Sequence, residues 1–83
     1  MDIQIYTLSY CPYCAAAKSF FDEKGIRYTE YEMDGDEEEE FKKLAKKFNI
    51  KGEVTAPQII IDCKRIGGYS DLMSKIDRGE LKF

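Results

Sequence analysis

Two kinds of residue pattern alternate along this chain, and their order limits the folds that it can adopt. Residues 3–8 and 27–33 alternate in the manner of β-strands. Between them, residues 12–24 begin at a proline, contain strong helix formers and stop before Gly25, which is typical of a helix. Because a strand–helix–strand unit takes a right-handed crossover, its two strands are parallel. The first half of the chain therefore predicts a parallel pair crossed by a helix.

The second half of the chain predicts a helix, two short strands and a last helix. Apolar residues at positions 41, 44, 45 and 48 form the stripe of an amphipathic helix. After a loop over 49–56, residues 58–61 and 64–66 read as strands joined by a turn, and a final helix runs from 69 or 70 to 79. The order is β-α-β-α-β-β-α, in which the closing strand pair is antiparallel. We expect an α/β fold with a four-stranded mixed sheet flanked by three helices.

Size and composition favour one globular domain over residues 1–83. The chain has 83 residues, of which 43% are hydrophobic and 13% aromatic, enough for one core and too few for two. No apolar run approaches the roughly 20 residues that cross a bilayer, and the first residues lack the features of a signal peptide. We expect a cytoplasmic monomer with no membrane partner.

Charge and missing residue types exclude several functions. Eight acidic residues and no basic ones lie between positions 28 and 40, whereas the other 70 residues carry 8 acids and 13 bases. The net charge of −3 argues against a nucleic-acid partner, although a small anion suits the basic remainder. The absence of histidine excludes Ser-His-Asp, Cys-His and HExxH chemistry.

The pair Cys11 and Cys14 lies where the first predicted strand meets the first helix. A cysteine at a helix N-terminus is favoured as a thiolate by the helix dipole and free N–H groups. We therefore expect Cys11, at the N-cap, to attack disulfides, and the more buried Cys14 to resolve the mixed disulfide. A zinc half-site is the alternative, but it needs a second ligand pair that Cys63 alone cannot supply. Cys63 itself reads as an incidental surface thiol.

Three motifs in order resemble those of dithiol glutaredoxins over nearly the whole chain. Residues 5–7 precede Cys-Pro-Tyr-Cys at 11–14, Thr-Ala-Pro-Gln-Ile follows at 55–59, and Ile-Gly-Gly-Tyr-Ser-Asp-Leu at 66–72. The resemblance implies a thioredoxin-like fold and reduction of protein–glutathione mixed disulfides and protein disulfides. It also implies glutathione as a co-substrate and no bound cofactor or metal.

The resemblance also implies residues that bind glutathione. Pro57 would be cis, although cis bonds make up only about 5–6% of X–Pro bonds and the sequence alone favours trans. The backbone of Thr55 and Ala56 would then pair with the ligand as a strand does. Tyr13 would flank the glycine end of glutathione.

The segment Gly68-Tyr69-Ser70-Asp71 would hold the opposite, γ-glutamyl end of the ligand. Free N–H groups of Ser70 and Asp71 suit a carboxylate, and the Asp71 carboxylate suits an ammonium. Taken alone, a glycine pair followed by Ser-Asp is more often a helix cap.

Two departures from the family pattern concern the charge beside the cysteines. Leu8 stands where glutaredoxins commonly carry a lysine, which removes one contact to the glycine carboxylate. The loop 49–54 looks longer than usual, and Lys51 is the first candidate for a base that reaches the ligand. Two other functions stay open: an iron–sulfur cluster carrier, and a glutaredoxin-like protein reduced by a thioredoxin reductase.

Two other features favour ordinary structural roles. Residues 34–38 superficially suggest a calcium loop, but the glycine is misplaced, so an acidic helix N-terminus is the preferred interpretation. Four phenylalanines read most simply as core residues: Phe20, Phe21, Phe41 and Phe48.

Overall fold

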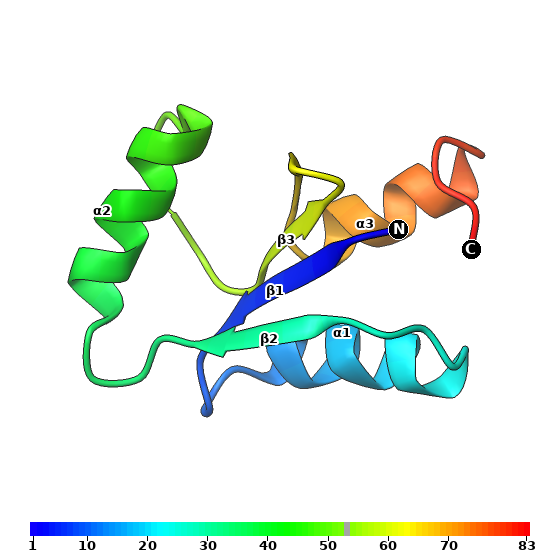
Figure 1. The fold of residues 1–83 in the computed structure, drawn as a ribbon, viewed down its shortest axis with the longest axis horizontal. Helices are drawn as coiled ribbons and strands as arrows, with labels where there is room; N and C mark the ends of the chain where they lie inside the picture. The colour runs from blue at the N-terminus through cyan, green and yellow to red at the C-terminus, as the bar shows by residue number, and fades with distance from the viewer. Residues whose placement is uncertain (53) are drawn as a thin grey trace.

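The elements of the computed structural model follow the predicted order (Figure 1). The structure describes residues 1–52 and 54–83; one residue of the predicted loop, Glu53, lies outside them. The elements are β1 (Ile3–Thr7), α1 (Pro12–Glu23), β2 (Thr29–Glu32), α2 (Glu37–Phe48), β3 (Gln58–Ile61), β4 (Lys64–Gly67) and α3 (Tyr69–Asp77). The predicted α/β class and the predicted β-α-β-α-β-β-α order are confirmed.

The four strands form one mixed sheet in the order β2-β1-β3-β4. The β1–β2 pair is parallel, with Tyr6 opposite Tyr31, as the crossover rule requires. The β1–β3 and β3–β4 pairs are antiparallel. The pairing of β3 with β4 shifts register between Ile59 and Ile60 of β3. Strand β2 is shorter than the predicted 27–33 and is exposed along its length, because it lies at the edge of the sheet and is held by pairing with β1.

The larger of two hydrophobic clusters joins α1 and α3 to the sheet. Alternate residues of β1 and β3 point to the same side, where they meet apolar residues of both helices. We call this the large cluster; its buried members are Ile3, Ile5, Ala17, Phe21, Ile59, Ile61 and Leu72. Since Ala17 and Phe21 lie on α1, this packing fixes the helix that begins next to Cys11.

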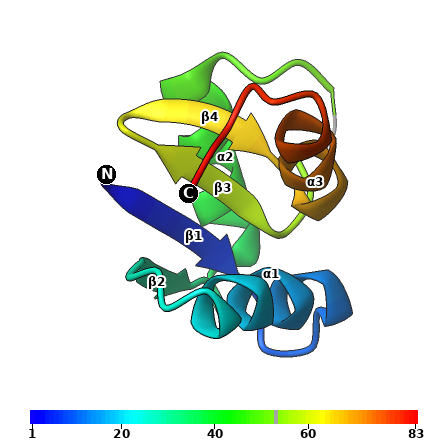
Figure 2. The same ribbon diagram turned by 90° about the vertical axis from the view of Figure 1, so that its right-hand side faces the viewer.

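The second cluster holds α2, which stands apart from α1 and α3 at the left of Figure 1 and behind the β3–β4 pair in Figure 2. We call it the small cluster; its buried members are Leu8, Met33 and Leu44. Leu8 and Met33 follow β1 and β2, so α2 covers the carboxyl ends of the two parallel strands.

The phenylalanine prediction was only partly correct. Phe21 is fully buried, whereas Phe20 is half-buried at the margin of the large cluster. Phe41 and Phe48 are half-buried at the margin of the small cluster. The reason is that α2 buries only one residue completely, Leu44, and its other apolar side chains remain at the rim.

Candidate functional site

Cys11 and Cys14 lie at the junction of β1 and α1, as the sequence predicts. Cys11 is the N-cap of α1, and the backbone N–H of Cys14 donates a hydrogen bond to Cys11 Sγ at 3.3 Å. Both thiols are free. Pro12 takes the first helical position, which needs no N–H, so the sequence itself places the Cys11 sulfur at the positive end of the helix.

The two thiols differ in environment. Cys11 is half-buried, whereas Cys14 is only 1% exposed. Burial raises the pKa of the Cys14 thiol to about 12, with a further contribution from its hydrogen bond with Cys11, while the Leu8 backbone and Lys18 act in the opposite direction. A thiol that stays protonated at neutral pH cannot attack first. The environment of Cys14 therefore suits the second, resolving role.

The Ala56–Pro57 peptide bond is cis, as the family resemblance implies. Pro57 is buried, and the thiol of Cys11 donates to the backbone carbonyl of Ala56 with an Sγ–O distance of 3.4 Å. The segment before β3 and the N-terminus of α1, distant in the sequence, therefore meet at the cysteine sulfur.

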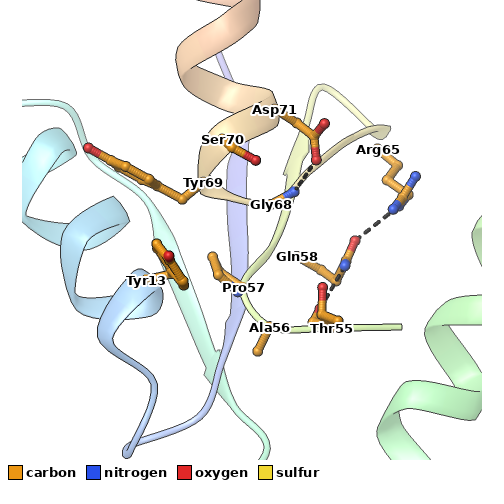
Figure 3. A pocket seen from close by; sticks show the side chains of 10 residues that line it. All are labelled: Tyr13, Thr55, Ala56, Pro57, Gln58, Arg65, Gly68, Tyr69, Ser70 and Asp71. Carbon is orange, nitrogen blue, oxygen red and sulfur yellow. Dashed lines mark hydrogen bonds between the residues drawn. The ribbon is translucent and has the colours of Figure 1, made fainter. Parts of the chain in front are cut away.

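A cavity of about 460 Å³ opens beside this contact (Figure 3). Its walls come from the start of α1, the segment before β3 with the first residue of β3, the strand β4 and the start of α3. The residues that line it are Tyr13, Thr55, Ala56, Pro57, Gln58, Arg65, Gly68, Tyr69, Ser70 and Asp71. The cavity thus brings together eight of the nine residues that the resemblance or the loop reading suggested for glutathione, all except Lys51.

Asp71 lies in the first turn of α3, where its carboxylate also caps the helix. The backbone N–H of Gly68 donates to Asp71 Oδ2 at 2.9 Å. Gly67, with φ of +117°, leaves room for this carboxylate, because a Cβ there would run into it. The helix-cap interpretation is therefore correct for one carboxylate oxygen, and Asp71 also supplies the cavity's one negative side chain among the described lining residues.

Two tyrosines form the aromatic side of the cavity. Tyr13 is 64% exposed, and its ring stacks on that of Tyr69 with a centroid distance of 6.4 Å. Figure 3 shows Tyr13 across the cavity from Asp71 and Arg65.

Two polar residues of the cavity were missed by the sequence analysis. Arg65 Nε donates to Gln58 Oε1 at 2.9 Å, and Gln58 Nε2 donates to the Thr55 carbonyl at 2.7 Å. Gln58 is only 2% exposed, so its amide fixes the direction of the Arg65 side chain. The sequence signal that could have found them is the alternation of side chains along the β3–β4 hairpin. This alternation places certain residues of the two strands on the same face of the sheet.

The structure does not place Lys51 or Leu8 in the cavity. Lys51 is exposed in the loop after α2 and is not among the described lining residues. Leu8 is 9% exposed and packs with Met33 and Leu44 in the small cluster. The position at which the resemblance leads us to expect a lysine is therefore an apolar core position in this chain.

The remaining sequence features lie away from the cavity. The Asp34 carboxylate accepts the backbone N–H of Ser9 at 2.9 Å, and Glu37 accepts the hydroxyl of Tyr10. These acids tie the loop before Cys11 to the start of α2. The described residues contain no cluster of three or more metal-ligating side chains, and Cys63 is exposed in the β3–β4 turn. No helix among them is long and apolar enough to cross a membrane.

Comparison with known proteins agrees with this geometry. The sequence model of the glutaredoxin family matches residues 3–66. The chain is 42% identical to Glutaredoxin 1 of Rickettsia bellii over 95% of its own length and 81% of that protein, and 38% identical to Glutaredoxin 3 of Escherichia coli K12 over 96% and 92%.

Solved structures give the same result. Glutaredoxin 1 of Francisella tularensis in complex with cacodylate superposes with a TM-score of 0.74 at 35% identity, covering 98% of both chains. A buckwheat glutaredoxin–glutathione complex superposes with a TM-score of 0.79 at 30% identity, covering 95% of this chain and 71% of that one. With a Cys-Pro-Tyr-Cys pair at a helix N-terminus beside a cis-proline, the chain belongs to the glutaredoxin family of thioredoxin-fold thiol–disulfide oxidoreductases.

Proposed function

We propose that this protein is a dithiol glutaredoxin that uses glutathione to reduce protein–glutathione mixed disulfides and protein disulfides. The observation that carries the proposal is the contact of Cys11 Sγ with the Ala56 carbonyl, at the wall of a cavity that also holds Asp71. The buckwheat relative binds glutathione in its crystal structure, which supports the same ligand here.

The cavity offers each part of glutathione a complementary group. Once Cys11 is a thiolate it no longer donates to the Ala56 carbonyl, which is then free to accept the N–H of a bound peptide. Asp71 carries the charge for the γ-glutamyl ammonium, and the N–H groups at the start of α3 suit its carboxylate. Tyr13 flanks the glycine end.

In the monothiol reaction, the Cys11 thiolate attacks the glutathione sulfur of a mixed disulfide. A bond forms between Cys11 and glutathione, the old S–S bond breaks, and the protein leaves as a thiolate that takes up a proton. A second glutathione thiolate then attacks the glutathione sulfur on Cys11 and releases glutathione disulfide.

In the dithiol reaction, Cys11 forms a mixed disulfide with a protein substrate, and Cys14 attacks the Cys11 sulfur. Because the Cys14 thiol is protonated at neutral pH, it must give up its proton during this step, and the departing substrate thiolate is the natural acceptor. Two glutathiones reduce the resulting Cys11–Cys14 disulfide. A reducing cytoplasm supplies this glutathione, and the reaction needs only one copy of the chain.

Three serine variants test the cysteine roles. We expect Cys11→Ser to lose both reactions, and Cys14→Ser to keep mixed-disulfide turnover while losing reduction of protein disulfides. Cys63→Ser is the matched control and should keep both, since Cys63 lies in an exposed turn. Equal loss of mixed-disulfide turnover in the Cys11 and Cys14 variants would contradict the assignment. Reduction by a thioredoxin reductase system, with no turnover by glutathione, would contradict the choice of reductant.

A variant of Asp71 tests whether this site binds glutathione. Because this carboxylate also caps α3, Asp71→Asn is the informative variant, since it keeps a cap acceptor and removes the charge. A charge-assisted hydrogen bond of about 1.5–3 kcal/mol predicts a rise in KM for glutathione substrates of tenfold or more. The melting temperature should hardly change. An unchanged KM would show that Asp71 only caps the helix.

A further inference from the structure

Gln58 is the polar residue of β3, a strand that is buried along its whole length. Its side chain is 2% exposed, and the three residues that follow it are buried isoleucines. A buried amide costs free energy unless its polar atoms are hydrogen-bonded. The partners of this amide therefore indicate what it does.

The amide of Gln58 joins two parts of the cavity wall (Figure 3). Its Nε2 donates to the Thr55 carbonyl at 2.7 Å, and its Oε1 accepts from Arg65 Nε at 2.9 Å. An arginine side chain has only donors, so it meets the oxygen of the amide and leaves the nitrogen for Thr55. Arg65 thus sets the orientation in which Gln58 holds the Thr55 carbonyl.

The contact with Thr55 fixes a peptide group beside the attacking thiol. The Thr55 carbonyl and the Ala56 N–H belong to one planar trans peptide group, in which they point in opposite directions. A hydrogen bond that holds the carbonyl therefore also sets the direction of the Ala56 N–H.

This hydrogen bond persists when the thiol ionises. In the described part of the chain, two side-chain hydrogen bonds reach residues 54–57. One is the bond from the Cys11 thiol to the Ala56 carbonyl, which is lost when Cys11 becomes a thiolate. The other, from Gln58 to Thr55, does not depend on the thiol and remains in the reactive state.

We propose that Gln58 is a positioning residue, whose amide holds the Thr55–Ala56 peptide plane ready to pair with the backbone of the substrate. The inference rests on the proposed function and deepens it. Backbone pairing does not depend on the side chains of the substrate. Gln58 therefore serves glutathione mixed disulfides and protein disulfides alike, and leaves the intrinsic reactivity of Cys11 unchanged.

The test compares three reagents. Two are peptide substrates: the glutathione mixed disulfide of a single-cysteine peptide, and a two-cysteine peptide with an internal disulfide. The third is methyl methanethiosulfonate, which has no amide to pair with Ala56. The Cys11 thiolate attacks its methylthio sulfur, a new S–S bond forms, and methanesulfinate leaves. Mass spectrometry follows the loss of the Cys11 thiol.

Two variants of Gln58 remove the bond to Thr55. Gln58→Met keeps the length of the side chain and loses the amide. Gln58→Glu keeps the acceptor for Arg65 and replaces the donor to Thr55 by a second acceptor. We expect both variants to lower kcat/KM for the two peptide substrates about three- to tenfold, chiefly through KM, with Gln58→Glu at least as impaired.

The reaction with methyl methanethiosulfonate should stay within about twofold of the parent rate in both variants. The matched control is Gln4→Met, the same substitution on β1 opposite Ile60, and it should change none of the three reactions. A fall in the methyl methanethiosulfonate rate equal to that of the peptide substrates would overturn the inference, because Gln58 would then act on Cys11 or on the fold. A Gln58→Glu variant as active as the parent would also overturn it.

Arg65→Met tests the orientation of the amide at an exposed position, where the fold is not at risk. It should lower kcat/KM for the two peptide substrates by equal factors, and by less than Gln58→Met does. A loss confined to the glutathione substrate would overturn the orienting role of Arg65.

Failure of this inference is distinguishable from failure of the proposed function. A parent protein that reduces the internal disulfide but does not turn over the glutathione mixed disulfide would contradict the proposed function. The internal disulfide and methyl methanethiosulfonate would then decide the role of Gln58 by themselves.

Discussion

The two hydrophobic clusters hold the two cysteines in different ways. The large cluster has seven buried residues and contains Ala17 and Phe21 of α1, the helix that carries Cys14. The small cluster has three, and Cys11 is one of the half-buried residues packed against it. Cys14 therefore lies on a helix that the large cluster anchors, whereas Cys11 lies at the margin of the small cluster.

The largest expected effect is the loss of packing in the large cluster. Phe21→Ala should lower the free energy of unfolding by about 3–5 kcal/mol, since the ring is fully buried and its neighbours cannot close the cavity. Urea denaturation measures this loss. Phe20→Ala is the matched control, because Phe20 is adjacent and only half-buried. Equal losses in the two variants would contradict the assignment of the core to Phe21.

Truncation in the small cluster should cost less. We expect Leu44→Ala to lower the free energy of unfolding by about 2 kcal/mol, the low end for such a change, because the half-buried side chains around it can move into the space. Lys43→Ala, one residue earlier and exposed, should change it little. A loss as large as that of Phe21→Ala would show that the small cluster is as tightly packed as the large one.

The Leu8→Lys variant tests the packing of the small cluster where it borders the cysteine pair. From the sequence alone, a lysine at this position is expected to favour the Cys11 thiolate and bind glutathione more tightly. Because Leu8 is buried, we expect the variant to be destabilised by about 1–2 kcal/mol, even though the ammonium can reach the surface. Leu8→Met keeps the volume and should cost less. Thermal unfolding compares the two, and a Lys variant as stable as the parent would contradict the packing argument.

The smallest expected loss of stability is that from removing the ion pair between Lys18 and Glu30. Lys18 Nζ lies 2.9 Å from Glu30 Oε2, which also accepts the hydroxyl of the buried Thr7 at 2.7 Å. These contacts, that of Lys18 first, lower the pKa of Glu30 from its ordinary 4.5. A lowered pKa in the folded state adds stability above about pH 4.5 that is lost as the pH falls through the folded-state value.

Glu30→Gln removes this titration. Because both side chains are about one third exposed, we expect the variant to be less stable by under about 1 kcal/mol at pH 7. The difference should shrink as the pH is lowered below 4.5. Unfolding of parent and variant across this pH range measures it, and a difference that does not depend on pH would contradict the linkage.

Local patterns predicted the elements because each pattern is decided within a few residues. The alternation of Ile3, Ile5 and Thr7 and the proline after Cys11 are examples, and both keep their predicted places in the structure. The family resemblance added what local patterns disfavour, namely the cis bond at Pro57. Residues Thr55 to Pro57 and Gly68 to Asp71 were expected at one site, and they share the cavity.

The sequence could not provide the position of long side chains, or which face of the sheet a given helix covers. Arg65 lies opposite Ile60 in the regular register next to the β3–β4 turn, which alternation could have suggested, but the hydrogen bond by which its side chain meets Gln58 at the cavity is a tertiary contact. Lys51 was the first candidate for a base that reaches the ligand because its position in the loop 49–54 was the only guide. Alternation places Leu8 on the face away from Ile5, but that α2 covers this face is a tertiary fact.

The thin packing of α2 has a consequence for how its amides exchange with solvent. With Leu44 as its one fully buried residue, the helix depends on local charges: four glutamates in its first turn and Lys46 and Lys47 in its last. It ends at Asn49 in the left-handed conformation, with φ of +53°. We therefore expect α2 to open as a unit while α1 remains closed, so that its amides exchange faster than those around Phe21, and faster still in concentrated salt.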